Sequence, residues 1–306
     1  MGELSLFHYD STGATELTSH TSPLERPLQR LVEGHLEQFL GVHLLQSEYS
    51  TGKLHGGRID TLGIDEDGSP VIVEYKRATD QNVVTQGLYY LDWLADHHGD
   101  FELLVRDRRG DELARSIDWE NPRLICVAAD FTKFDTYAVQ QIDRNISLVR
   151  YKQFDPDLIL FELVNATTSS KSRPAANPAV TGPGKAAEGP DRPLTDVLAH
   201  AKPEVQEWFA ELREYALNLG DDVQEKSLKL YLAFKRVRNF CCIVVQSQRL
   251  CLYLRLDPTN LELDPGFTRD VRAIGHWATG DLEVTVDSST DLEPAMSLIR
   301  QSYEAS

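Results

Sequence analysis

The sequence of 306 residues has few cysteines and no long apolar run, and each shortage excludes a class of protein. Its four cysteines show no C-x-x-C spacing and lie within apolar runs, which excludes a disulfide miniprotein and indicates buried, reduced thiols. No stretch approaches the roughly 20 apolar residues of a membrane span, and no secretory signal is visible. We therefore expect a soluble cytoplasmic protein without a membrane partner.

Basic residues are also scarce, at 31 Lys and Arg against 48 Asp and Glu, a net charge of −17. This balance argues against a phosphate-bearing partner, but it is uneven. Residues 1–164 hold 15 basic and 28 acidic residues, whereas residues 194–306 hold 12 and 18. From Lys226 to Leu256 seven basic residues occur with no acidic one, so this segment is a local exception.

Several catalytic patterns are missing as well. No Walker loop, Ser/His/Asp triad or zinc spacing can be assembled from the sequence. His276 and Trp277 form a GHW motif, but a histidine in a turn before an aromatic residue is more often structural. His97 and His98 end a predicted helix, where they complement its dipole.

The chain divides at a stretch rich in Pro, Ala, Gly and Ser. Residues 165–193 have no apolar period, which is typical of a flexible linker. We predict a first domain at 1–164 and a second at 194–306. Length supports this division, because 306 residues exceed a usual single domain.

Apolar periodicity predicts the elements of both domains. In the first domain we expect helices at 23–40, 81–97 and 134–144, and strands at 44–49, 58–65, 71–76, 124–129, 147–154 and 158–164. In the second we expect helices at 203–219 and 292–303, and strands at 227–234, 240–246, 250–256 and 282–286. The first domain is thus α/β, with an αβββαβ order, and the second is a smaller α+β domain.

The predicted hairpin at 58–76 contains the main candidate catalytic residues. A three-residue loop, Glu66-Asp67-Gly68, pairs Asp65 with Ser69 and places Asp60 opposite Glu74. Lys76 then shares the face of Glu74. A two-residue turn would instead place Asp60 opposite Tyr75 and separate the carboxylates.

Opposed carboxylates on an otherwise apolar strand pair require a compensating cation. Mg²⁺ is the natural candidate, because it is commonly held by one or two carboxylates together with waters and phosphate oxygens. A lysine beside it could orient a water or stabilise charge on phosphorus. Such a site hydrolyses phosphodiesters. The alternative, that Lys76 only neutralises Asp60 and Glu74 on a solvated face, has about even odds from this pattern alone.

Gln86 and Tyr90 lie four residues apart on the next predicted helix and therefore share a face. They could position a phosphate or the water-bearing end of the site. When these two residues are taken alone, ordinary packing of a helix surface is the favoured explanation.

Together, GGRID (56–60), VIVEYK (71–76) and Q-x-x-x-Y (86–90) resemble the PD-(D/E)XK nuclease superfamily, and most closely its RecB-like and NucS-like branch. The resemblance covers about residues 25–165 and implies a restriction-endonuclease-like core with a mixed sheet. It implies that Asp60 and Glu74 bind Mg²⁺ or Mn²⁺, that Lys76 is catalytic, and that Gln86 and Tyr90 support the site.

The superfamily also places a glutamate on its first helix. Glu37 is our choice for this metal ligand, and Glu33 is the competitor. NucS-type mismatch endonucleases place the nuclease domain second, whereas here it comes first, so mismatch specificity does not follow from the resemblance. The C-terminal region resembles a small domain of unknown function that often follows such nuclease domains.

The basic stretch of the second domain is a candidate nucleic-acid surface. The alternatives are that its aromatics are core residues, which we favour, and that its basic side chains are simply solvated. The candidate contacts in this stretch are Lys229, Lys235, Arg236, Arg238, Arg249 and Arg255.

These observations predict a Mg²⁺-dependent endonuclease whose partner is nucleic acid, with DNA favoured. A homodimer is left open. The rival interpretation is a catalytically inactive nucleic-acid-binding or protein-interaction module that keeps the fold, and the −13 charge of residues 1–164 favours it, because this charge repels duplex DNA.

Overall fold

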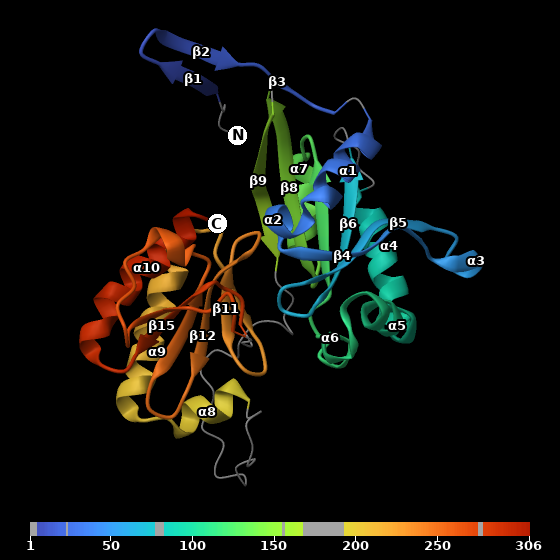
Figure 1. Ribbon diagram of the computed structural model, residues 1–306. Helices are drawn as coiled ribbons and strands as arrows, with labels where there is room; N and C mark the ends of the chain where they lie inside the picture. The colour runs from blue at the N-terminus through green and yellow to red at the C-terminus, as the bar shows by residue number, and fades with distance from the viewer. Residues whose placement is uncertain (1–4, 23, 77–82, 155–156, 168–192, 275–277) are drawn as a thin grey trace. The chain divides into compact units, whose positions relative to one another are not determined.

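The computed structural model describes residues 5–22, 24–76, 83–154, 157–167, 193–274 and 278–306. The chain splits into two compact units, residues 1–167 and 168–306 (Figure 1). Each unit contains a sheet with helices packed against it. The predicted linker begins three residues too early, because a strand continues through Thr167, and most of the rest of it lies outside the described residues.

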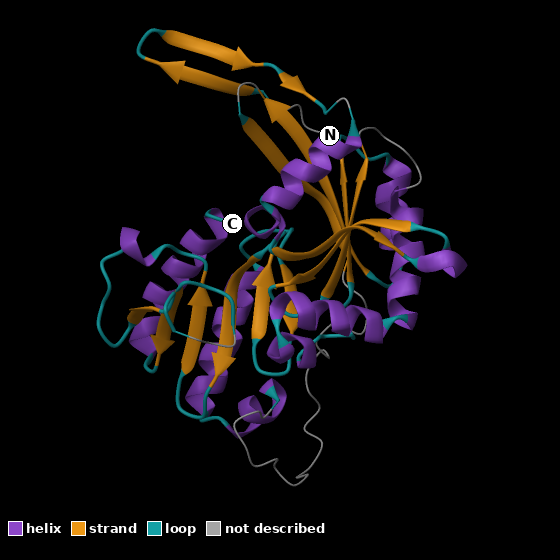
Figure 2. Cartoon of the chain, turned by 45° about the vertical axis from the view of Figure 1, so that its right-hand side comes forward, coloured by secondary structure: helices purple, strands orange, loops and turns teal. Residues whose placement is uncertain are grey.

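The first unit is built around a mixed seven-stranded sheet. Its strands are ordered β3-β8-β7-β6-β5-β4, and β9 pairs with β8. Figure 2 shows the strands in orange and the helices in purple. Strands β6, β7 and β8 run parallel, and the other neighbours run antiparallel. The strands of this sheet are β3 (Ser19–His20), β4 (Val42–Ser50), β5 (Arg58–Asp65), β6 (Pro70–Lys76), β7 (Arg123–Ala128), β8 (Asn145–Phe154) and β9 (Leu158–Thr167).

The described part of this unit also contains a separate hairpin and seven helices. The hairpin pairs β1 (Leu6–Asp10) with β2 (Gly13–Leu17). The helices are α1 (Glu25–Gly34), α2 (Leu36–Leu40), α3 (Gly52–His55), α4 (Val83–Asp96), α5 (His98–Arg109), α6 (Asp111–Arg115) and α7 (Lys133–Gln140). The order α1/α2, β4, β5, β6, α4, β7 confirms the predicted αβββαβ core.

The predicted helix at 23–40 is in fact two helices. His35 leaves helical geometry with φ −136° and ψ 29°, so α1 ends at Gly34 and α2 starts at Leu36. Gly34, the last residue of α1, weakens the helix, because glycine loses more backbone entropy on folding than other residues and has no side chain to pack. Residues before and after Gly34 therefore do not share one helical face.

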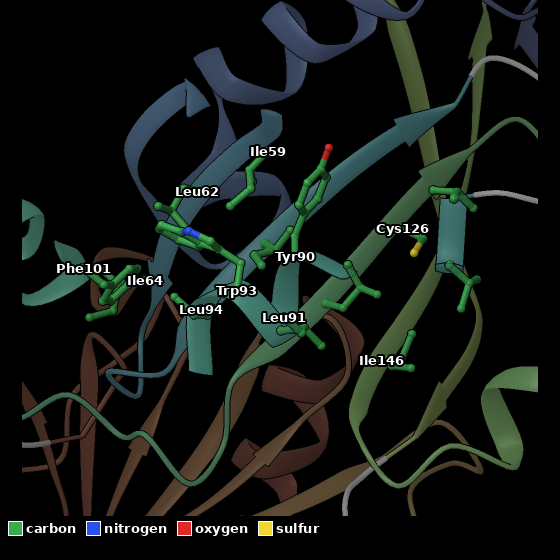
Figure 3. Packing of buried hydrophobic residues seen from close by; sticks show 14 of the residues in the cluster. Ile59, Leu62, Ile64, Tyr90, Leu91, Trp93, Leu94, Phe101, Cys126 and Ile146 are labelled. Atoms are coloured by element: carbon green, nitrogen blue, oxygen red, sulfur yellow. The ribbon is translucent and has the colours of Figure 1, made fainter. Parts of the chain in front are cut away.

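Helix α4 packs on the sheet through a dense apolar core. Leu91 and Leu94 on the helix meet Ile64 on β5 and Ile146 on β8 in one cluster of buried side chains (Figure 3). Burial of these side chains stabilises the fold by about 1.5–3 kcal/mol each relative to exposure. The helix therefore occupies one defined position over the strands that carry Asp60 and Glu74.

The closest approach of α4 to the sheet occurs at Gly87. A Cβ atom there would lie 2.3 Å from Leu124 Cδ1 on β7. We expect Gly87→Ala to lower the free energy of unfolding by about 1–3 kcal/mol through overpacking, although alanine is the better helix former. Gly99→Ala on α5 is the control, because no atom lies within 4 Å of its Cβ position. Urea unfolding measures both, and equal stability of the two variants would contradict this packing.

The second unit is an α+β domain, as predicted. Its antiparallel sheet has the order β10-β11-β12-β13-β15-β14. The strands are β10 (Gln224–Ser227), β11 (Leu232–Lys235), β12 (Asn239–Val245), β13 (Leu250–Leu254), β14 (Thr268–Asp270) and β15 (Leu282–Val286). The helices are α8 (Leu194–His200), α9 (Pro203–Leu217) and α10 (Leu292–Glu304), with short 3₁₀ turns at Pro258–Asn260 and Ser289–Asp291.

The single strand predicted at 227–234 is wrong, because a tight turn interrupts it. The Leu228 N–H donates to the Tyr231 carbonyl oxygen at 2.9 Å, which reverses the chain between β10 and β11.

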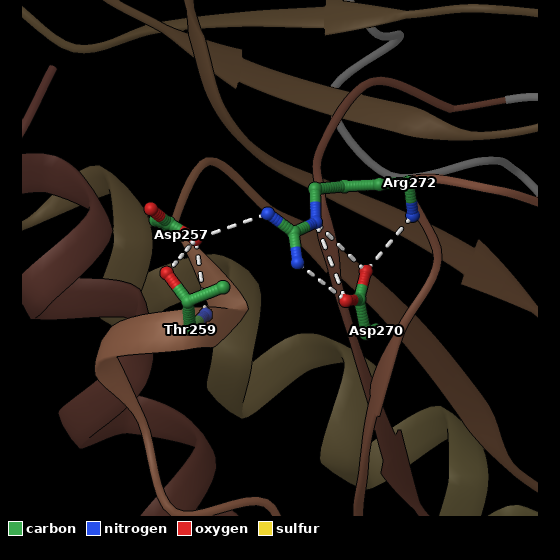
Figure 4. A network of polar contacts seen from close by, with 4 residues as sticks. All are labelled: Asp257, Thr259, Asp270 and Arg272. Carbon is green, nitrogen blue, oxygen red and sulfur yellow. Dashed lines mark hydrogen bonds and ion pairs between the residues drawn. The ribbon is translucent and has the colours of Figure 1, made fainter.

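A surface network in this unit joins two loops. The Arg272 guanidinium contacts Asp270 Oδ2 at 2.7 Å and Asp257 Oδ1 at 3.3 Å, and Thr259 donates to the same Asp257 oxygen (Figure 4). All these groups are exposed or nearly so, so each pair contributes little to stability.

Candidate active site

The hairpin that carries the candidate site has the predicted register. Thr61 pairs with Val73 and Leu62 pairs with Ile72, and the Asp65 N–H donates to the Ser69 carbonyl oxygen at 2.9 Å. This pairing requires the three-residue loop, in which Gly68 takes a left-handed φ of 80°. The same count places Asp60 opposite Glu74.

Regular pairing of β5 with β6 ends at Thr61, and carboxylates take over its hydrogen bonds. The Asp60 N–H donates to Glu74 Oε1 at 3.2 Å, and the Tyr75 N–H donates to Asp60 Oδ2 at 3.1 Å. The structure therefore brings Asp60 and Glu74 together. Sequence alternation alone could not show these backbone contacts.

Glu74 is the most constrained group of the site. Its side chain is 0% exposed, and its Oε2 atom has no hydrogen-bond partner. Burial, and then the nearby charge of Asp60, raises the pKa of Glu74 from 4.5 to about 9. Burial also raises the pKa of Asp60. Without a metal, Glu74 thus holds a proton at neutral pH.

An unpartnered buried oxygen fits a divalent cation. Leaving such an atom unsatisfied costs about 1–3 kcal/mol, and coordination would offset that cost. Asp60 and Glu74 offer hard oxygen ligands, which suit Mg²⁺ or Mn²⁺. Among the described residues, no group of three or more His, Cys, Asp or Glu side chains could hold a metal ion. The protein therefore contributes a carboxylate pair, and waters or substrate oxygens would complete the coordination.

Lys76 lies at the end of β6, with 15% of its side chain exposed. Its positive charge lowers the pKa of both Asp60 and Glu74, although burial outweighs it at each. Its Nζ atom is 3.7 Å from Glu25 Oε2, on the first turn of α1. The charge of Glu25 also raises the pKa of Asp60.

Glu25 is thus a candidate that sequence reasoning missed. The signal that could have found it is the i, i+4 spacing of Glu25, Gln29 and Glu33, which places all three on one face of α1. Gln29 donates to the Asp60 carbonyl oxygen at 2.8 Å and to Glu33 Oε1 at 3.1 Å. This face of α1 therefore contacts β5 at the candidate site.

The two glutamates expected from the sequence lie elsewhere. Glu37 belongs to α2, where its carboxylate is 3.1 Å from His43 and 59% exposed. Glu33 accepts a hydrogen bond from Thr61 Oγ1 at 2.6 Å, and the Tyr75 hydroxyl lies 3.2 Å from the same Thr61 oxygen. The structure thus places Glu33 against Thr61, the residue that follows Asp60. It does not bring Glu37 to the carboxylate pair.

Tyr90 on α4 is attached to β5. Its hydroxyl oxygen accepts a hydrogen bond from the Arg58 N–H at 3.1 Å, two residues before Asp60. Its ring is buried. Gln86 lies one turn earlier on the same helix and is partly buried. The pair is thus on the helix that covers the site, and its catalytic role stays a prediction.

The predicted basic residues of the second unit differ in exposure and in their partners. Lys235 is buried, and Arg236 pairs with Asp222 at 2.6 Å while stacking on Tyr303. Arg255 donates to the Asn239 carbonyl oxygen at 2.9 Å. Lys229 and Arg249 are exposed, and Arg238 is partly buried. Their contact with nucleic acid stays a prediction.

Three of the four aromatic residues among them are core residues, as favoured from the sequence, whereas Tyr253 is only partly buried. Phe234 and Phe240 are fully buried, and Tyr231 is nearly so. The GHW motif, with His276 and Trp277, lies outside the described residues. No helix in the described part of the chain has the length and apolar character to cross a membrane.

Comparison with known proteins gives one relative along nearly the whole chain. An uncharacterized protein of Haemophilus influenzae is 32% identical over 297 residues, which are 95% of this chain and 96% of that protein. Residues 194–306 match the family described as "Domain of unknown function (DUF5655)". This match agrees with the resemblance expected for the C-terminal domain.

Two solved structures are distantly similar. A repair endonuclease from Pyrococcus abyssi is 16% identical with a TM-score of 0.28, over 48% of this chain and 65% of that one. The complex named "EndoMS-dsDNA2" is 19% identical with a TM-score of 0.25, over 43% of this chain and 47% of that one. Scores this low are too weak to transfer either activity to this chain.

Proposed function

We propose that this chain, which belongs to the same family as the Haemophilus influenzae protein, is a metal-dependent endonuclease that hydrolyses phosphodiester bonds in DNA. The observation that carries the proposal is the unpartnered Oε2 atom of buried Glu74, beside Asp60 and within reach of the charge of Lys76. A carboxylate pair that can hold a divalent ion, with a lysine beside it, offers the positive charge that stabilises the transition state of phosphodiester hydrolysis.

Each residue has a task in this proposal. Asp60 and Glu74 would hold Mg²⁺ or Mn²⁺, which supplies charge stabilisation and a more acidic water. Lys76 would stabilise the negative charge that develops on the phosphoryl oxygens. Glu25 would orient the Lys76 ammonium group through their 3.7 Å contact. Tyr90 and Gln86 would keep α4 against the strand that carries Asp60.

In this proposal the first-helix glutamate implied by the resemblance is Glu25 on α1, and no longer Glu37, which lies on α2. We expect Glu25→Gln to lower the cleavage rate by roughly tenfold or more, because it removes a charge beside Lys76. Glu37→Gln is the matched control and should cleave at the wild-type rate, since its carboxylate contacts His43 instead. Single-turnover cleavage measures both. A loss in Glu37→Gln with a normal Glu25→Gln would restore the original assignment.

The function itself is tested with a substrate panel. The purified full chain is incubated with labelled linear, branched, mismatched and single-stranded DNA, in Mg²⁺, in Mn²⁺ and in chelator. We expect internal cleavage of at least one substrate with either metal and none with chelator. Binding without cleavage would favour the inactive module, and cleavage in chelator would exclude the metal mechanism. A cytoplasmic location and a homodimer stay predictions.

A further inference from the structure

The segment that joins β4 to the first residue of β5, residues 51–58, is fixed in place by two adjacent tyrosines of α4. We call this segment the α3 loop. The Tyr89 hydroxyl donates to the His55 carbonyl oxygen, and the Tyr90 hydroxyl accepts from the Arg58 N–H at 3.1 Å. The loop also closes on itself, since the Thr51 N–H donates to the Gly57 carbonyl oxygen at 3.1 Å. The loop is therefore anchored at its middle and at both ends.

Packing against Tyr90 adds to this anchoring. A Cβ atom on Gly57 would lie 2.6 Å from Tyr90 Cε1, so the backbone rests directly on the ring. Gly56 takes a left-handed φ of 62° at the end of α3. A loop with these constraints presents its side chains in defined directions and loses little entropy on binding a ligand.

The side chains that the α3 loop presents are basic. Lys53, His55 and Arg58 occur in it with no Asp or Glu, although residues 1–164 carry a net charge of −13. Lys53 is exposed, and the Arg58 side chain is 62% exposed while it pairs with Glu48 at 2.9 Å. This loop is thus a local group of basic side chains in an otherwise acidic unit, of the kind that attracts phosphate groups.

An aromatic platform lies beside these cations. The Tyr89 side chain is 46% exposed, and its ring centroid is 4.9 Å from that of His55. Because the Tyr89 hydroxyl is fixed on the loop backbone, the orientation of the exposed ring is set before any ligand binds. Exposed rings next to cations are what proteins use to bind single strands, where each base offers a face for stacking.

The platform is also close to the candidate active site. Arg58 lies two residues before Asp60 on β5, and Tyr90, which holds Arg58, is the neighbour of Tyr89 on α4. Bases within a paired duplex cannot stack on a protein ring unless they are extruded. Duplex DNA also meets more repulsion from this acidic unit, because its phosphates are more densely spaced.

We infer that the α3 loop binds an unpaired nucleic-acid strand beside the carboxylate pair, with a base on Tyr89 and His55 and phosphates on Lys53 and Arg58. The inference rests on the proposed function, to which it adds the substrate class: single-stranded or locally unpaired nucleic acid.

Binding without cleavage tests the inference. Fluorescence anisotropy measures the affinity of the full chain, in chelator, for single-stranded DNA, single-stranded RNA and a blunt DNA duplex. Tyr89→Leu should weaken binding of at least one single strand by roughly five- to a hundredfold and change duplex binding less. Lys53→Ala should reduce the salt dependence of single-strand binding by about 0.7 in its logarithmic slope.

Helix α7 provides matched controls, because it also exposes a lysine and a tyrosine, Lys133 and Tyr137. Lys133→Ala and Tyr137→Leu should bind all three nucleic acids as the wild type does. Tyr89→Phe separates the two roles of Tyr89, since it keeps the ring and loses only the hydroxyl contact with His55. It should retain most single-strand affinity, and thermal melting shows that each variant is folded.

The inference is overturned if folded Tyr89→Leu binds single strands like the wild type, or loses duplex affinity to the same extent. If Tyr89→Leu does not fold, unchanged single-strand binding by Lys53→Ala overturns it instead. These results are distinct from failure of the proposed function, because no cleavage is measured. If the wild type cuts DNA and Tyr89→Leu binds single strands normally, the proposed function stands and this inference fails. If single-strand binding depends on Tyr89 and the wild type cuts no DNA, this inference stands and the proposed function fails.

Discussion

Asp60→Asn is expected to lower the rate of metal-dependent DNA cleavage by roughly a hundred- to ten-thousandfold. The carboxylate accepts a hydrogen bond from Tyr75 and lies beside the unpartnered oxygen of Glu74, so an amide in its place removes one of two protein ligands. A bound metal ion contributes several kcal/mol of transition-state stabilisation, which corresponds to that range of rates. Lys76→Ala should cause a loss of similar size.

The control for this experiment is Asp92→Asn. Asp92 lies on α4 and is exposed, so its replacement changes the charge of the unit equally without touching the site. Single-turnover rates at saturating Mg²⁺ compare the variants, and circular dichroism checks their folding. Full activity of folded Lys76→Ala would show that the assigned mechanism is wrong.

Glu74→Gln is expected to stabilise the metal-free protein, and increasingly so as the pH rises. The folded-state pKa of Glu74 is raised to about 9, against an ordinary value of 4.5. Between these values the unfolded chain has lost the proton that the folded chain keeps, so the stability of the wild type falls with rising pH. Glutamine carries no ionisable proton, and its contribution is independent of pH.

The size of this effect follows from linkage. Each pH unit between the two pKa values costs the wild type at most about 1.4 kcal/mol, so the advantage of Glu74→Gln should grow by a few kcal/mol between pH 5.5 and 8.5. Urea unfolding in chelator at both pH values measures it. Glu120→Gln, at an exposed position, should show no such trend. A difference between Glu74→Gln and wild type that is constant with pH would contradict the raised pKa.

We expect Mg²⁺ to reverse the order of stability of the wild type and Glu74→Gln. Binding to the folded state alone stabilises a protein by RT ln(1 + [L]/Kd), so wild type should gain stability in Mg²⁺. Glu74→Gln should gain much less, because it has lost a charged ligand.

The β5–β6 hairpin was predictable because local chemistry determines it. Glu66-Asp67-Gly68 supplies a left-handed glycine at the position where the loop needs one, and the alternation of the flanking strands sets the rest. The position of Glu74 opposite Asp60 then followed from counting. The hydrogen bonds by which Asp60 and Glu74 replace regular pairing did not, because they depend on where the strands separate.

The glutamate of the first helix was harder to predict, because its position depends on a break in that helix. The apolar period runs through Gly34 without interruption, and this continuity predicts one helix, on which the resemblance led us to choose Glu37 over Glu33. The break at His35 places Glu37 on a separate helix and leaves Glu25 nearest Lys76. Tertiary contacts, which the sequence does not display, determine that orientation.

Elements with few buried residues were missed or misread. Helix α5 buries only Phe101 and Val105, so its apolar stripe is too narrow to stand out against its many charges. For the basic stretch of the second unit, nucleic-acid contact and simple solvation both stayed open, because charge along a sequence does not show where each side chain points. The turn after β10 and the alternation of the strands distribute Lys235 and Arg236 into different surroundings.

The most direct test of the carboxylate site is the position of Mn²⁺ in crystals of the wild-type chain, found by anomalous scattering. The account predicts an ion bound by Asp60 and Glu74 together, with oxygen distances of about 2.1 Å. It also predicts that the same peak disappears in Glu74→Gln. Mn²⁺ absent from this position at millimolar concentration and pH 8, with the two side chains arranged as described, would contradict the metal site and the nuclease mechanism built on it.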